Sequence, residues 1–175
     1  MTPPSVAAAF GLALATVAAP AAAQPADGII PLPLQPVVPA AQRTCAARTA
    51  SGLGYDELRK GTGPKAGPTD YVLVNYIGYL AASGQVFDQA TTTPMTIDGV
   101  IPGFSEGLKL IPRGGIWRFC IPAALGYGKA GTGPIPPDAD LVFQVELVDS
   151  RTAAEVEAMR REAGAGAGAP PAGKR

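Results

Sequence analysis

Two long segments in which apolar side chains recur at every second position constrain the fold most strongly. In residues 71–80 this alternation places Val72, Val74 and Tyr76 on one face of an extended chain. Residues 141–148 repeat the pattern more clearly, because their odd positions are leucine, phenylalanine, valine and leucine in turn. Period-two alternation is typical of strands with one buried face and one face in water. We therefore expect a β-sheet that is covered on one face.

Shorter segments with the same character complete the sheet. The turn at residues 82–85 contains a glycine and predicts a hairpin between residues 71–80 and the strand that follows. A threonine-rich loop that ends at Pro94 is expected to separate that strand from the next one. The four further strands are expected at residues 55–60, 86–88, 95–98 and 117–121.

A single helix is expected between these strands. It begins at Pro102, because proline suits the first turn of a helix, and Phe104 and Leu108 give it an apolar side at i and i+4. Gly114 and Gly115 are expected to end the helix. One helix packed across an antiparallel sheet satisfies the two-layer rule, so the predicted fold class is α+β.

Charge and composition exclude several functions. The 14 basic and 14 acidic residues give a net charge of zero and form no basic stripe, so a nucleic-acid partner is not expected. The chain contains no histidine, which excludes a Ser-His-Asp or Cys-His catalytic centre and removes the commonest metal ligand. We therefore expect no metal site and no cofactor.

The two ends of the chain differ from the middle. An apolar run from Val6 to Ala19 precedes small residues at 21–23, a pattern typical of a cleaved signal peptide, although no lysine or arginine precedes the run. A membrane anchor is the alternative, but about 14 apolar residues are too few to span a bilayer. The expected organisation is a signal peptide at 1–23, a Pro-rich extended linker at 24–44, a folded domain at 45–150, and a short helix with a flexible Gly/Ala tail at 151–175.

Six ordered sequence blocks of the folded middle resemble one known family. In order and spacing they are similar to the FKBP-type peptidyl-prolyl cis-trans isomerases, and the resemblance covers residues 53–149. It implies a half-open antiparallel sheet wrapped around one short helix, with a shallow pocket between them. The blocks are VNYIG at 74–78, GQVFD at 84–88, VIPGFSEGL at 100–108, LGYG at 125–128, IPP at 135–137 and LVFQVEL at 141–147.

The resemblance also implies which residues line the pocket. It assigns catalytic roles to three groups. The Asp88 carboxylate is expected to be partly buried beside Tyr76. The Tyr127 hydroxyl and the Ile101 N–H are expected to hold substrate carbonyls. The implied substrate-binding residues are Tyr76, Phe87, Val100, Ile101, Phe104, Ile135 and Phe143.

Two positions depart from the family pattern. Phe104 stands where the family usually has a tryptophan pocket floor, and Met95 stands where it usually has an aromatic wall. These departures leave the implied fold intact and bear on catalytic rate and on affinity for macrolide inhibitors.

The resemblance implies acceleration of X-Pro isomerisation while exported proteins fold in the bacterial periplasm. The expected partners are proline-containing unfolded or exposed segments, with macrolide inhibitors as a further implied class and no stable membrane insertion after signal cleavage. From strand position alone, Tyr76, Phe87 and Phe143 would be ordinary core aromatics. If Phe104 and Met95 leave the pocket too loose for catalysis, the alternative function is a non-catalytic module that binds Pro-containing segments of envelope proteins.

The two cysteines, Cys45 and Cys120, are expected to form a disulfide. An even number of cysteines in an exported chain favours pairing. Alternation in residues 117–121 points Trp117 inward and Cys120 outward, and in the implied fold the strand that follows Cys45 runs beside this one. Two free thiols are the alternative.

Overall fold

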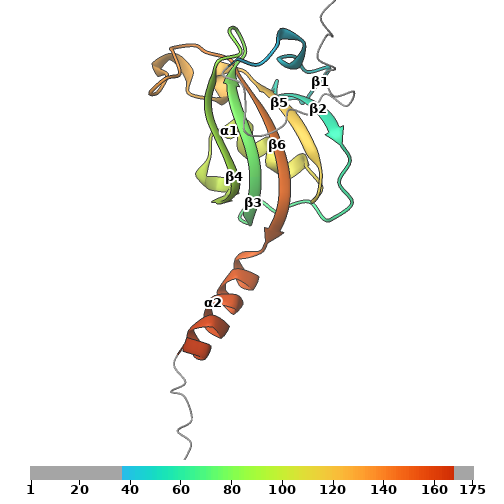
Figure 1. Ribbon diagram of the computed structural model, residues 1–175, viewed down its shortest axis with the longest axis vertical. Helices are drawn as coiled ribbons and strands as arrows, with labels where there is room; N and C mark the ends of the chain where they lie inside the picture. The colour runs from blue at the N-terminus through green and yellow to red at the C-terminus, as the bar shows by residue number, and fades with distance from the viewer. Residues whose placement is uncertain (1–36, 168–175) are drawn as a thin grey trace, which may run out of the picture.

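Six antiparallel strands form one sheet in the order β1-β2-β5-β6-β3-β4 (Figure 1). The computed structural model describes residues 37–167. Two α-helices and four short 3-10 helices accompany the sheet within this part of the chain. The strands are β1 (Ala47–Arg48), β2 (Gly54–Arg59), β3 (Tyr71–Leu80), β4 (Val86–Thr96), β5 (Ile116–Ile121) and β6 (Leu141–Arg151). The helices are α1 (Pro102–Leu110) and α2 (Ala153–Ala167), and the 3-10 helices are η1 (Ala40–Gln42), η2 (Ile97–Gly99), η3 (Ala123–Leu125) and η4 (Gly128–Ala130).

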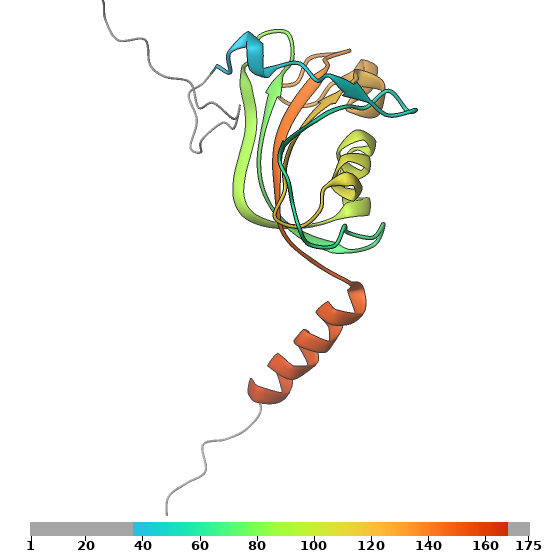
Figure 2. The ribbon, with the colours of Figure 1, turned by 90° about the vertical axis from the view of Figure 1, so that its right-hand side faces the viewer.

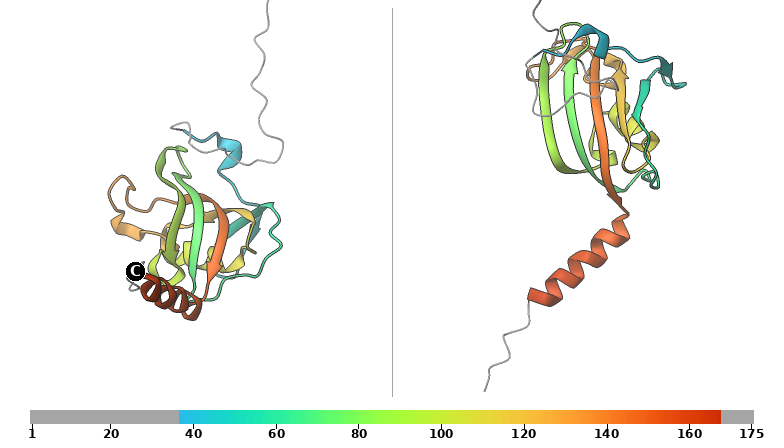
Figure 3. Two further views of the ribbon diagram at one scale, coloured as in Figure 1. Left: turned by 60° about the horizontal axis from the view of Figure 1, so that its bottom comes forward. Right: turned by 45° about the vertical axis from the view of Figure 1, so that its right-hand side comes forward.

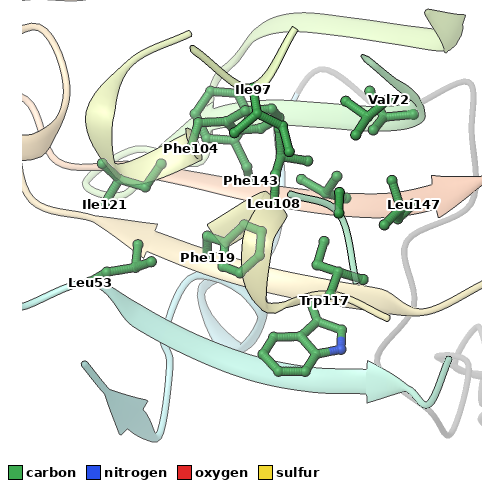
Figure 4. Packing of buried hydrophobic residues seen from close by; sticks show 14 of the residues in the cluster. Leu53, Val72, Ile97, Phe104, Leu108, Trp117, Phe119, Ile121, Phe143 and Leu147 are labelled. Atoms are coloured by element: carbon green, nitrogen blue, oxygen red, sulfur yellow. The ribbon is translucent and has the colours of Figure 1, made fainter. Parts of the chain in front are cut away.

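The sheet curves around α1, which confirms the expected α+β fold (Figure 2). Proline occupies the first turn of α1, and the buried residues Phe104 and Leu108 pack into the core that the concave face forms (Figure 4). From β6, Phe143, Val145 and Leu147 enter the same core, as their alternation predicts. Trp117 is also buried there and stacks on Tyr55, with their ring centroids 5.5 Å apart.

The threonine-rich segment is part of a strand, so the expected division into strands 86–88 and 95–98 is wrong. The two are one continuous strand, β4, which pairs with β3 along its whole length. Threonine is β-branched and suits an extended chain, and Pro94 is tolerated because β4 is the edge of the sheet. Two register shifts in this pairing insert extra residues into β4.

The convex face of the sheet is also covered in part, contrary to the expectation of one covered face. Val38 is fully buried against Ile77, Tyr79 and Val142 on this face. The Val38 N–H donates to the carbonyl of Gly84 at 2.8 Å, and the Tyr79 hydroxyl donates to the carbonyl of Gln42 at 2.6 Å. Residues 37–44, expected as the end of a linker, therefore pack against the folded domain.

A disulfide joins Cys45 to Cys120, as expected, with a Cα–Cα distance of 6.0 Å. It connects the segment before β1 to the convex side of β5 across a sequence separation of 75. Gly54 makes room for the bridge, because a Cβ atom there would lie 2.9 Å from the Cβ of Cys120 and 3.1 Å from that of Cys45.

Helix α2 extends away from the end of β6 (Figures 1 and 3). Thr152 and Glu155 start it with a reciprocal capping box: each side chain accepts a hydrogen bond from the other residue's backbone N–H. The helix continues to Ala167, beyond the helix-forming residues 153–162 of the sequence prediction, although the added segment contains glycine, which is a poor helix former. Helix α1, in contrast, ends at Leu110, before the glycines that were expected to stop it. No helix among residues 37–167 is long and apolar enough to cross a membrane. The expected signal peptide, most of the linker and the end of the tail lie outside the described residues.

Candidate active site

A cavity of about 460 Å³ opens between β3, β4, β6 and the start of α1. Its walls are mainly aromatic and aliphatic, and its polar side chains are few. Eight of the nine residues that the sequence places in the pocket converge on it: Tyr76, Phe87, Asp88, Val100, Ile101, Phe104, Tyr127 and Phe143. Met95 and Gly99 line it as well.

Four aromatic rings from four different elements form the apolar part of the cavity. Phe143 of β6 lies at the centre, with its ring centroid 4.8 Å from Phe104 of α1 and 5.5 Å from Phe87 of β4 (Figure 4 shows Phe104 and Phe143). The ring centroid of Tyr76, on β3, lies 6.0 Å from that of Phe104. The edge-to-face angles of these three pairs are favourable for aromatic rings and fix their orientation. The apolar walls are therefore made of rings that pack against one another.

A β-bulge places two consecutive side chains of β4 in the cavity. Gly78 of β3 pairs with Asp88 and Tyr79 pairs with Val86, so Phe87 is an extra residue between them. Consecutive residues of a regular strand face opposite sides of a sheet, and a bulge removes this alternation locally. Phe87 and Asp88 consequently both line the cavity.

Gly78 is the residue that allows the rings of Phe87 and Phe143 to approach each other. A Cβ atom on Gly78 would lie 2.6 Å from Cε1 of Phe143 and 2.7 Å from Cζ of Phe87. Both distances are shorter than side chains tolerate, so the aromatic wall requires glycine at this position.

The polar groups lie at the rim. The Tyr76 hydroxyl donates a hydrogen bond of 2.7 Å to Oδ2 of Asp88. Burial raises the pKa of Tyr76 above its usual value, and the hydrogen bond and negative charge of Asp88 raise it further. Tyr76 therefore remains a neutral donor at physiological pH, and it fixes the Asp88 carboxylate in place.

Asp88 itself is exposed, which corrects the expectation that it is partly buried. The bulge carries its carboxylate to the open side of the cavity, where water reaches it. Tyr127 lines the same cavity and is 39 % exposed, and Gly128 follows it with a φ of 58°. Ile101 is half-buried and forms the N-cap of α1, so its N–H precedes the first turn of the helix.

The lining of the cavity differs from the expected one at three positions. Ile135 is buried in the core and is not among the residues that line the cavity, because its loop turns it inward through a bridge with Thr132. Met95 was singled out only as a departure from the family pattern, and Gly99 was missed. Gly99 stands directly before Val100, so its place in the chain was a usable signal.

The described residues contain no group of three or more histidine, cysteine, aspartate or glutamate side chains able to hold a metal ion. The lining of the cavity offers apolar walls, one neutral phenol, a second phenol at the rim, and one exposed carboxylate.

Comparisons with known proteins agree with this geometry. The family model described as FKBP-type peptidyl-prolyl cis-trans isomerase matches residues 63–148. FkpA of Escherichia coli, an FKBP-type peptidyl-prolyl cis-trans isomerase, is 44 % identical over 114 residues, which are 63 % of this chain and 42 % of FkpA. A probable FKBP-type 25 kDa isomerase of Pseudomonas aeruginosa is 44 % identical over 102 residues, or 57 % of this chain and 44 % of that protein.

Solved structures show the same relationship. The crystal structure of a peptidyl-prolyl cis-trans isomerase from Pseudomonas syringae matches with a TM-score of 0.58 and 38 % identity, covering 61 % of this chain and 80 % of that one. This chain spans about two fifths of the length of the curated relatives that it matches. Over the folded domain, fold, cavity and sequence agree, and the chain belongs to the FKBP-type peptidyl-prolyl cis-trans isomerase family.

Proposed function

We propose that this protein accelerates cis-trans isomerisation of X-Pro peptide bonds in polypeptides that are folding. The observation that carries the proposal is the aromatic cavity of about 460 Å³ with polar groups only at its rim, in a chain of this family. The cavity is proposed to hold the proline ring, and macrolide inhibitors would compete for the same walls.

An apolar cavity is sufficient for this reaction, because no covalent bond is made or broken. Amide resonance imposes a barrier of about 18–20 kcal/mol, and uncatalysed X-Pro isomerisation takes roughly tens to hundreds of seconds. In the twisted transition state the amide loses resonance, so its carbonyl oxygen is less polar than in the planar ground state. Dry walls therefore favour the transition state more than water does, which is catalysis by differential binding.

The rim groups orient the substrate. The Ile101 N–H and the Tyr127 hydroxyl would donate to substrate carbonyls on either side of the rotating bond. The Asp88 carboxylate, held by Tyr76, would face that bond from β4. Its negative charge would repel the partial negative charge that resonance places on the carbonyl oxygen of the planar amide, and so would favour loss of amide resonance.

We expect Tyr127→Phe and Asp88→Leu each to lower kcat/KM for an X-Pro peptide by about tenfold, because one polar contact at the transition state is worth about 1.4 kcal/mol. The measurement is a protease-free isomerisation assay. Tyr71→Phe is the matched control, since Tyr71 lies at the start of β3 and does not line the cavity. Unchanged rates in both rim variants would contradict the assigned roles. Saturable peptide binding without any acceleration by the wild type would instead favour a non-catalytic binding module.

We further propose that the protein is exported to the periplasm. The apolar run at residues 6–19, the small residues at 21–23 and the disulfide support this, because disulfides persist in oxidising compartments. One relative, 41 % identical over 109 residues, is the outer membrane protein MIP of Legionella longbeachae. Mass spectrometry of protein from a periplasmic extract should give an N-terminus at Gln24. A periplasmic protein that retains residues 1–23 would contradict signal cleavage.

A further inference from the structure

Two residues of β4, Asp88 and Met95, both line the cavity, although a regular strand would place them on opposite faces. Asp88 and Met95 are seven positions apart, and residues separated by an odd number lie on opposite faces of a regular strand. The pairing with β3 explains how both reach the cavity. Tyr76 pairs with Ala90, whereas Val74 pairs with Thr93, so two steps along β3 correspond to three along β4. This second bulge restores Met95 to the face that carries Asp88.

Thr92 lies in this bulge in a backbone conformation that requires support. Its φ of 52° is in the left-handed region, which β-branched residues rarely adopt. The Thr92 N–H donates a hydrogen bond of 2.7 Å to Oδ1 of Asn75 on the neighbouring strand β3. The side chain of Asn75 thus provides the acceptor that the interrupted strand pairing lacks at this point.

The orientation of Asn75 is fixed from the other side. Its Nδ2 donates to Oε2 of Glu146 at 2.7 Å, and Asn75 and Glu146 are directly opposite each other in the pairing of β3 with β6. The other oxygen of Glu146 accepts from Arg59, which also donates to the carbonyl of Gly114. Because the carboxylate takes the Asn75 amide NH₂, the amide oxygen must face Thr92. A chain of hydrogen bonds therefore runs from β2 across the sheet to the bulge.

We propose that Asn75 is a positioning residue for the cavity: by holding the extra residue Thr92 in β4, it keeps the Met95 side chain on the pocket wall. Asn75 does not line the cavity and acts only through β4. Without this hydrogen bond, the bulge would move along β4 or close, and Met95 would turn toward the outer face. The consequence for catalysis rests on the proposed isomerase function, whereas the placement of Met95 does not.

The test combines Asn75→Ala with a rescue. Asn75→Ala should remove the nuclear Overhauser contacts between the Met95 methyl group and the other residues that line the cavity. It should also raise KM for an X-Pro peptide by about fivefold with little change in kcat. The proline ring itself does not change during the reaction, so a contact between Met95 and that ring is equal in the ground state and in the transition state. The double variant Asn75→Ala/Thr92→Gly should restore the methyl contacts and KM, since glycine adopts positive φ without help.

Tyr79→Phe is the matched control, because Tyr79 lies on the same face of β3 and loses a hydrogen bond to Gln42 far from the bulge. It should lower stability and leave the Met95 contacts unchanged. If Asn75→Ala does not fold, Glu146→Ala removes the acceptor of the Asn75 NH₂ group, so the amide can rotate and the same contacts should weaken. Unchanged Met95 contacts in the tested variant, failure of Thr92→Gly to restore them, or equal loss in Tyr79→Phe would overturn the proposal. A wild type without isomerase activity would refute the proposed function, and the methyl contacts would still decide the role of Asn75.

Discussion

Replacement of Gly78 by alanine is expected to lower kcat/KM for X-Pro isomerisation by about a hundredfold. The added Cβ would lie 2.6 Å from Phe143 and 2.7 Å from Phe87. Gly78 lies within the sheet, so the backbone cannot retreat and the two rings must move. They would move toward the cavity that they line, and the space for the proline ring would shrink.

The same chain offers a matched control for overpacking. A Cβ atom added to Gly107 of α1 would lie 2.7 Å from the ring of Phe119. Phe119 is fully buried and does not line the cavity. Gly78→Ala and Gly107→Ala should both lower the free energy of unfolding by about 1–3 kcal/mol, because both overpack an aromatic ring. Only Gly78→Ala should abolish most of the isomerase activity. Equal kinetics in the two variants would show that the Gly78 contacts do not shape the catalytic cavity.

Loss of the disulfide is the second large effect. The double variant Cys45→Ser/Cys120→Ser should lose about 2–4 kcal/mol of unfolding free energy, near the upper end because the bridge closes a loop with a sequence separation of 75. Guanidinium unfolding of the variant and of the oxidised wild type measures this difference. Isomerase activity should persist under native conditions, since the bridge lies on the convex side of the sheet, away from the cavity.

The bridge also secures the segment that covers the convex face. Without it, Val38 and its contacts with Ile77 and Val142 depend only on local packing and hydrogen bonds. Amide hydrogen exchange at Val38, whose N–H bonds to Gly84, should therefore accelerate in the double variant. An unchanged unfolding midpoint would contradict the account, as would two reactive thiols in denatured, exported wild-type protein.

The sequence predicted the regular parts of this fold because they depend on local patterns. Alternation identified β3 and β6, and a proline followed by apolar residues at i and i+4 identified α1. These two inferences need only the residues of one element and the periodicity of its backbone. The pairing of Cys45 with Cys120 needed more: the even number of cysteines, the outward direction of Cys120, and the strand order that the family resemblance implies.

The irregular parts depend on contacts between distant residues and were not predicted. The bulge at Thr92 is supported by Asn75, 17 positions earlier, so a run of threonines before a proline reads as a loop. Burial of Val38 depends on side chains of β3 and β6, which no local pattern of residues 24–44 reveals. The exposure of Asp88 follows from the bulge at Phe87. A bulge interrupts the alternation of side chains, so a prediction based on alternation cannot locate it.

The most direct test of the central claim is exchange NMR on a short peptide with one X-Pro bond, recorded with and without catalytic amounts of the wild-type protein. If the cavity binds the twisted amide more tightly than the planar one, cis and trans proline signals should exchange far faster in the presence of protein. The rate should rise in proportion to protein concentration and should fall sharply with Gly78→Ala. Exchange that stays at the uncatalysed rate, while the peptide signals shift on saturable binding, would contradict the account.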